Sequence, residues 1–102
     1  MAFSEDVKDV FGYALHLAQH GEKHFNAKPL KGLSGAKTLE VVEDHQGDTY
    51  RAVYTVKFEG YVFVLHCFQK KSKKGIATPK PDIDKIRARL KDAELLHQEL
   101  SR

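Results

Sequence analysis

Two strand-like segments on either side of a Glu-Gly pair constrain the fold of this chain more than any other feature. They read TYRAVYTVKF at residues 49–58 and YVFVLHCFQ at residues 61–69. Both are rich in aromatic and β-branched residues, which favour strands. The intervening Glu59-Gly60 is typical of a two-residue hairpin turn. The sequence therefore predicts an antiparallel hairpin in the second half of the chain.

The position of this turn fixes which side chains share a face, because side chains alternate along a strand and a one-residue slip reverses every one of them. On one face the predicted pairs are almost wholly apolar and should bury the helices: Val56–Phe63, Tyr54–Leu65, Ala52–Cys67 and Tyr50–Gln69. On the opposite face the predicted pairs are Val53–His66, Arg51–Phe68 and Thr49–Lys70. We therefore expect Arg51, His66, Phe68 and Lys70 to be neighbours there.

The flanking segments predict helices and one more strand. Ser4 can cap a helix that Gly21 ends, and residues 22–35 read as a loop. The alternating KTLEVVE from Lys37 predicts a strand, and DHQGD predicts a turn. Asp82 is expected to cap a last helix, whose apolar stripe is Ile83, Ile86, Leu90 and Ala93.

This order of elements predicts one α+β domain over residues 1–102, with a small antiparallel sheet of about three strands packed against an N-terminal and a C-terminal helix. The single cysteine, Cys67, allows no internal disulfide, and its place in an apolar strand predicts a buried thiol. No apolar run approaches a membrane span, and the first residues lack the layout of a signal peptide. A cytoplasmic protein with no membrane contact is expected.

Basic residues gather where the second hairpin strand ends. Lys70, Lys71, Lys73 and Lys74 follow one another within five positions, and the chain has a net charge of +3. A net positive charge of this kind favours an anionic partner. Arg51 can bind phosphate bidentately, and Phe68 can stack on an unpaired base. The alternatives are a solvated loop for the lysines, an ion pair with Glu40 for Arg51 and a structural role for His66.

A metal site is the weaker interpretation of the histidines in the first helix. His16, His20 and His24 are spaced by four, so that His16 and His20 share a helix face and can bind a metal ion. His24 should lie beyond the helix end at Gly21. We expect these histidines to be exposed surface residues, with no metal and no cofactor in the protein.

A longer pattern resembles a known family. The string GDTYRAVYTVKFEGYVFVLHCFQKKSKKG, followed by TPKPDIDKIRARL, resembles the HigB-type, phage-derived branch of the RelE/ParE toxin superfamily. The earlier YALHLAQHGEKHFNAKPLKGLSG looks like the helical region of that branch. Family members commonly begin with a strand before the first helix. Here the chain starts almost at the helix, so one sheet edge is expected to be exposed.

The resemblance implies a RelE-like fold and the toxin of a type II toxin–antitoxin system. Such a toxin is a ribosome-dependent mRNA endonuclease that uses the 2′-OH of the message for attack and needs no metal. The implied catalytic residues are Arg51, His66 and Lys70, and the implied RNA-binding residues are Phe68, Lys71, Lys73 and Lys74. The implied partners are a helix-turn-helix antitoxin, the ribosome and mRNA, and a homodimer is compatible with the pattern. The alternative is a non-cleaving relative, either a gyrase inhibitor or an inactive protein that binds antitoxin or ribosome.

Overall fold

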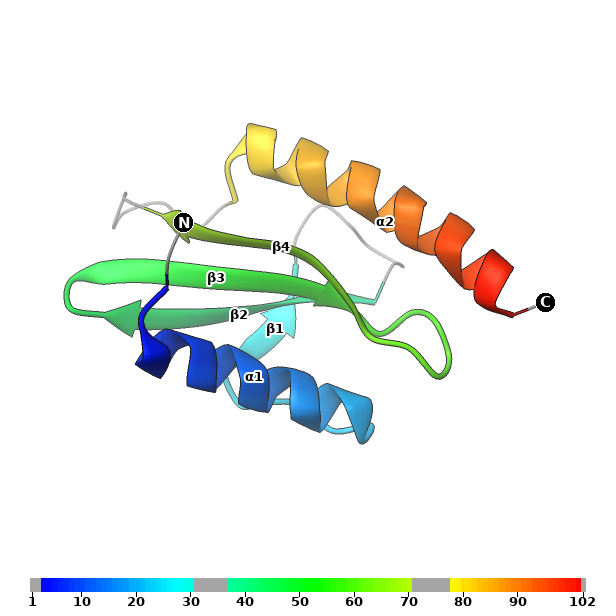
Figure 1. Ribbon diagram of the computed structural model, residues 1–102. Helices are drawn as coiled ribbons and strands as arrows, with labels where there is room; N and C mark the ends of the chain where they lie inside the picture. Colours follow the sequence, from blue (N-terminus) through cyan, green and yellow to red (C-terminus); the bar gives the residue numbers. More distant parts are fainter. Residues whose placement is uncertain (1–2, 31–36, 71–77, 102) are drawn as a thin grey trace.

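The protein is an antiparallel sheet with one helix on each side (Figure 1). The computed structural model describes residues 3–30, 37–70 and 78–101, with the backbone alone at Lys70. The sheet has the order β1-β2-β3-β4, with all neighbours antiparallel. The elements are α1 (Glu5–Gln19), β1 (Ala27–Pro29), β2 (Thr38–His45), β3 (Asp48–Thr55), β4 (Phe63–Lys70) and α2 (Lys80–Leu100). The predicted α+β class is confirmed.

The sheet has one strand more than the sequence indicated. The short strand β1 lies in the stretch that was predicted to be a loop, and it pairs with residues Leu39–Val41 of β2. The edge that was expected to be exposed is therefore paired over these three positions. Pro29 ends β1, and a proline in a strand is best tolerated at an edge because it has no N–H to donate.

The first helix begins and ends as its sequence predicts. The Ser4 hydroxyl accepts a hydrogen bond from the backbone N–H of Val7 at 3.3 Å. At the other end Gly21 has a φ of 77°, a conformation that glycine adopts without strain. The N–H groups of Gly21 and Glu22 then donate to the carbonyls of Ala18 and Leu17 at 3.1 and 2.8 Å. This is the Schellman arrangement, which satisfies carbonyls that the helix leaves unpaired.

The register of the β3–β4 hairpin is as predicted over half its length and then shifts. From Thr49–Lys70 to Val53–His66 the pairs are those derived from the sequence. Beyond them a bulge intervenes, so that Tyr54 lies opposite Val64 and not opposite Leu65. The ladder ends at Thr55 and Phe63, earlier than predicted. The predicted turn at Glu59-Gly60 is confirmed, because the Tyr61 N–H donates to the carbonyl of Phe58 at 3.1 Å and Gly60 has a φ of 85°. In a bulge of this kind, two residues of one strand lie opposite one residue of the partner strand. Counting pairs by strict alternation does not predict such an extra residue.

Both faces of the sheet are covered by apolar clusters, and the bulge contributes to one of them. It brings Leu65 into the cluster under α2, where it joins Val53, Phe68 and Ile86. On the other face α1 buries Val7 and Phe11 against strand residues that include Val41 and Tyr54. The expectation that one face would bury both helices was wrong, because α1 and α2 lie on opposite sides of the sheet (Figure 1). The face that carries His66 is the one under α2, since His66 contacts Asp82 and Arg89 of that helix.

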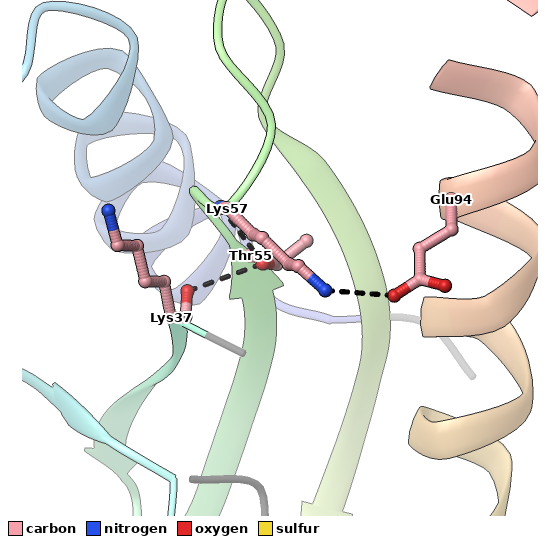
Figure 2. Close-up of polar contacts among 4 residues, drawn as sticks. All are labelled: Lys37, Thr55, Lys57 and Glu94. Carbon is pink, nitrogen blue, oxygen red and sulfur yellow. Dashed lines mark hydrogen bonds and ion pairs between the residues drawn. The ribbon is translucent and has the colours of Figure 1, made fainter. Parts of the chain in front are cut away.

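A small polar junction fixes the chain where β3 leaves the sheet (Figure 2). The fully buried Thr55 hydroxyl donates to the carbonyl of Lys37 at 3.3 Å and accepts from the N–H of Lys57 at 3.1 Å. The Lys57 ammonium then reaches across to Glu94 of α2 at 2.9 Å. Because both charged groups of that ion pair are well exposed, it contributes little to stability. The hydroxyl bonds, by contrast, satisfy backbone groups at the strand end.

Three expectations about single residues were wrong. His24 was expected on the exposed surface, and its side chain is buried. Cys67 is exposed and not buried, because β4 is an edge strand and α2 covers only its opposite face. Asp82 does not cap α2, which begins at Lys80 after Pro79. Its carboxylate binds His66 instead.

The buried phenol of Tyr54 generates a prediction about stability. Its side chain is 1% exposed, and no hydrogen-bond partner for its hydroxyl lies among the described residues. Tyr54→Phe removes a desolvated hydroxyl without opening a cavity, so thermal unfolding at neutral pH should show equal or higher stability. Tyr13→Phe, at an exposed ring, is the matched control. A loss above about 1 kcal/mol in Tyr54→Phe would contradict the absence of a partner.

The same phenol predicts a dependence on alkaline pH. Burial raises the pKa of Tyr54 above its ordinary value of 10.0. Above pH 10 the unfolded chain therefore loses this proton while the folded chain keeps it, and the free energy of unfolding falls as pH rises. Denaturant titrations from neutral to alkaline pH should show a smaller decrease in Tyr54→Phe than in the parent protein. An identical decrease in both proteins would show that the phenol titrates equally in the two states.

Candidate functional site

The guanidinium of Arg51 lies in a buried ion pair. Its Nη1 is 3.2 Å from Oε2 of Glu40, and the two side chains are 6% and 5% exposed. The pair is diagonal across β2 and β3, since Arg51 lies directly opposite Val42. The ammonium of Lys28 on β1 approaches the other carboxylate oxygen at 3.7 Å from a mostly exposed position. The ion pair named as the alternative for Arg51 is thus present.

His66 is held between two charged residues of α2. Its Nε2 is 2.8 Å from Oδ1 of Asp82, and its Nδ1 is 2.9 Å from Nη1 of Arg89. A guanidinium can only donate, so Nδ1 must carry the lone pair and Nε2 the hydrogen that is donated to Asp82. The contacts therefore specify a neutral imidazole with one defined tautomer.

Arg89 also satisfies the backbone at the bulge. The same Nη1 donates to the carbonyl of Leu65 at 2.9 Å, and a bulge leaves such a group outside the regular ladder. One guanidinium nitrogen thus binds both the bulge residue and its neighbour His66. The arrangement places an exposed arginine directly beside the imidazole.

The ring of Phe68 is packed inside the protein. It is 6% exposed and stacks on the His66 ring, with centroids 4.8 Å apart and planes 18° from parallel. It belongs to the apolar cluster beneath α2. In this conformation the ring supports the imidazole, and its face is not open to a base.

The predicted site residues divide into three groups. Arg51, His66 and Phe68 are brought together on adjacent positions of β3 and β4, as the register required. Lys70 ends β4 opposite Thr49, next in line on the same face. Lys71, Lys73 and Lys74 lie outside the described residues.

Sequence reasoning missed Asp82 and Arg89 as contacts of the imidazole. Their spacing of seven places them on one side of α2, flanking the apolar stripe that was recognised. That spacing would have predicted both contacts if the last helix had been expected to pack on the sheet face that carries His66. Within the described part of the chain, no group of three or more histidine, cysteine or acidic side chains could hold a metal ion.

A pocket of about 750 Å³ lies elsewhere, between the end of α1 and the β3–β4 loop. It is lined by α1 residues such as Ala18 and loop residues such as Tyr61, and by none of the candidate site residues. Among the described helices, none is long and apolar enough to cross a membrane.

The buried ion pair generates a prediction about folding. Arg51→Ala leaves the Glu40 carboxylate buried, with the more distant Lys28 as its remaining cation among the described residues. Denaturant unfolding should therefore show a loss of about 3–5 kcal/mol. The double variant Arg51→Leu/Glu40→Leu should recover most of that loss, because it leaves no unpaired buried charge. Lys57→Ala is the control and should cost about 1 kcal/mol or less. Equal effects of Arg51→Ala and Lys57→Ala would contradict a buried pair.

Comparison with known proteins matches the chain to a protein family. A family model described as Phage derived protein Gp49-like (DUF891) matches residues 1–91. No curated protein and no solved structure gives a significant match to the chain. The matched segment contains every described candidate site residue on β3, β4 and α2. The chain therefore belongs to the phage-derived Gp49-like family, a toxin-like family of the RelE/HigB type.

Proposed function

We propose that the chain is the toxin of a type II toxin–antitoxin pair, which cleaves mRNA on the ribosome and is neutralised by a helix-turn-helix antitoxin. The observation that carries the proposal is the register of β3 and β4, which aligns Arg51, His66, Phe68 and Lys70 on one face. Membership of a toxin-like family supports the same conclusion.

The proposed reaction uses the 2′-OH of the message and requires no metal. The 2′ oxygen forms a bond to the adjacent phosphorus while the bond from phosphorus to the 5′ oxygen breaks. A base takes the proton of the 2′-OH, and an acid supplies a proton to the 5′ oxygen. The products are a 2′,3′-cyclic phosphate and a 5′-OH end. Each proton transfer contributes about 10²–10⁴ to the rate.

His66 fits the role of proton-transfer residue because its tautomer is defined. Its Nδ1 carries a lone pair, and Asp82 binds the N–H on the other side of the ring. An adjacent carboxylate that fixes the tautomer also stabilises the imidazolium that forms when the base accepts a proton. In this proposal Arg89 leaves Nδ1 and contacts the phosphate, for which a guanidinium has suitable geometry.

Arg51 fits the role of stabilising the phosphate charge if it exchanges Glu40 for the phosphate. The exchange does not leave the carboxylate without a cation, since Lys28 already lies 3.7 Å from it. Lys70 is the next position of β4 in the register, opposite Thr49, and is proposed to contribute a further cation. Donors aimed at developing charge give the largest single contribution in many enzymes.

A non-cleaving function is the second candidate, and one specific observation favours it. Arg51 is 6% exposed and bound to Glu40, while α2 covers Phe68. A protein that kept this conformation on its target would bind the target without contacting a scissile phosphate. Gyrase inhibition or antitoxin binding alone would suit such a protein.

Mapping mRNA ends in a translating extract tests the proposed cleavage. The parent protein should create new 5′-OH ends in ribosome-bound message and none in naked RNA. His66→Gln should reduce cleavage by about tenfold or more. Arg51→Lys should retain little cleavage, because lysine lacks the bidentate fork of the guanidinium. His45→Gln, in the β2–β3 hairpin, is the control. Absence of cleavage by folded parent protein would reject the endonuclease and leave the binding function.

The four lysines predict how binding depends on salt. If Lys70, Lys71, Lys73 and Lys74 contact RNA backbone, their engagement contributes roughly −3 to the slope of log affinity against log salt, at about −0.7 per phosphate. Replacing all four with alanine should weaken binding to the ribosome or RNA and flatten that slope, with little change in stability. An unchanged slope in the quadruple variant would show that the lysines are a solvated loop.

A further inference from the structure

A pair of histidines on the last turns of α1 is unconnected with the site under α2. His16 and His20 are both exposed, and their ring centroids are 4.4 Å apart. Tyr13 stacks on the His16 ring at 6.4 Å with the planes 19° apart, which restrains the imidazole. The sequence left a metal role for this pair as the weaker interpretation, and the hydrogen bonds now bear on it.

The decisive contact is the bond from His20 to the helix backbone. Its Nδ1 is 2.8 Å from the carbonyl oxygen of His16. A carbonyl can only accept, so Nδ1 carries the hydrogen, and in the neutral ring Nε2 keeps its lone pair. Histidines that bind metals commonly donate their other ring N–H to such a carbonyl, which fixes the tautomer and the orientation of the ring. His20 therefore has the arrangement of a metal ligand before any metal binds.

We propose that His16 and His20 chelate a divalent transition-metal ion of the Ni²⁺, Cu²⁺ or Zn²⁺ type at the end of α1. Two histidines four apart on a helix face the same side and can bind one ion, as in helical zinc motifs. Imidazole selects these ions, whereas Mg²⁺ and Ca²⁺ prefer oxygen ligands. Water completes the coordination.

The place in the fold favours a cation. His16 and His20 lie at the C-terminal end of α1, where the helix dipole carries partial negative charge. His24 is not a third ligand, because its ring is buried and its Nδ1 accepts from the N–H of Asn26 at 3.0 Å. The site is thus a two-histidine chelate that links the last two turns of α1.

Binding should stabilise the fold, because the unfolded chain does not hold the two rings together. A ligand that binds only the folded state raises its stability with increasing concentration. Since α1 packs on the sheet through Phe11 and Ala14, holding its last turns raises the melting temperature of the whole protein. This effect is independent of any action on RNA.

Titration of the untagged protein with NiCl₂ tests the site, in a Cys67→Ser background that removes the exposed thiol. Calorimetry should show one ion per chain, and the melting temperature should rise with nickel and not with magnesium. His16→Gln and His20→Gln should each weaken binding on the order of 100-fold, because the second ligand of a chelate acts at high effective concentration. His45→Gln should bind as the parent does.

Spectra assign the position independently of affinity. Paramagnetic Ni²⁺ should broaden amide resonances of residues 13–21 first, and leave those around His45, His66 and His97 sharp. The proposal is overturned if His16→Gln or His20→Gln binds nickel as tightly as the parent. It is also overturned if broadening centres on another histidine or if no saturable binding occurs.

Discussion

The contact between Arg89 and the bulge in β4 is the interaction on which the arrangement of the site depends. A single guanidinium nitrogen donates both to the Leu65 carbonyl and to His66. It thereby gives a hydrogen-bond donor to the Leu65 carbonyl, which the bulge leaves outside the ladder. It also fixes the tautomer of the His66 imidazole. The apolar residues of α2 supply the burial: Ile86 and Ala93 are buried, and Ile83 and Leu90 pack beside them. The polar contacts of Arg89 and Asp82 add to this packing and hold His66 against α2.

This arrangement has a consequence for function. Arg51, His66 and Phe68 are adjacent, as a phosphate-binding face requires, yet each is engaged within the protein by Glu40, by Asp82 and Arg89, or by the cluster under α2. Each of these internal contacts occupies the guanidinium, imidazole or ring that RNA would need to contact. Binding of RNA is thus proposed to be an exchange of internal partners for phosphate, with Lys28 and the exposed Arg89 making that exchange less costly.

Local signals predicted the helices and turns well. The Ser4 cap, the Gly21 terminus and the Gln46-Gly47 turn depend on a few neighbouring residues, and the structure confirms them. The register from Thr49 to Val53 also followed from counting. The bulge at Leu65 did not follow from counting, because it depends on tertiary contacts. It gives α2 an apolar side chain to pack against and gives Arg89 a carbonyl to bind. The burial of Phe68, the exposure of Cys67 and the pairing of Asp82 all follow from that helix position, which periodicity alone does not give.

The protonation state of His66 tests this account most directly. A long-range ¹H–¹⁵N spectrum of the imidazole groups at neutral pH distinguishes a protonated nitrogen from one with a lone pair. We expect Nε2 of His66 to carry the hydrogen and Nδ1 to carry none. Arg89→Gln, which removes the charged donor, should loosen this preference. A fully protonated ring, or a hydrogen on Nδ1, would contradict the Arg89 contact and with it the position of α2 over the site.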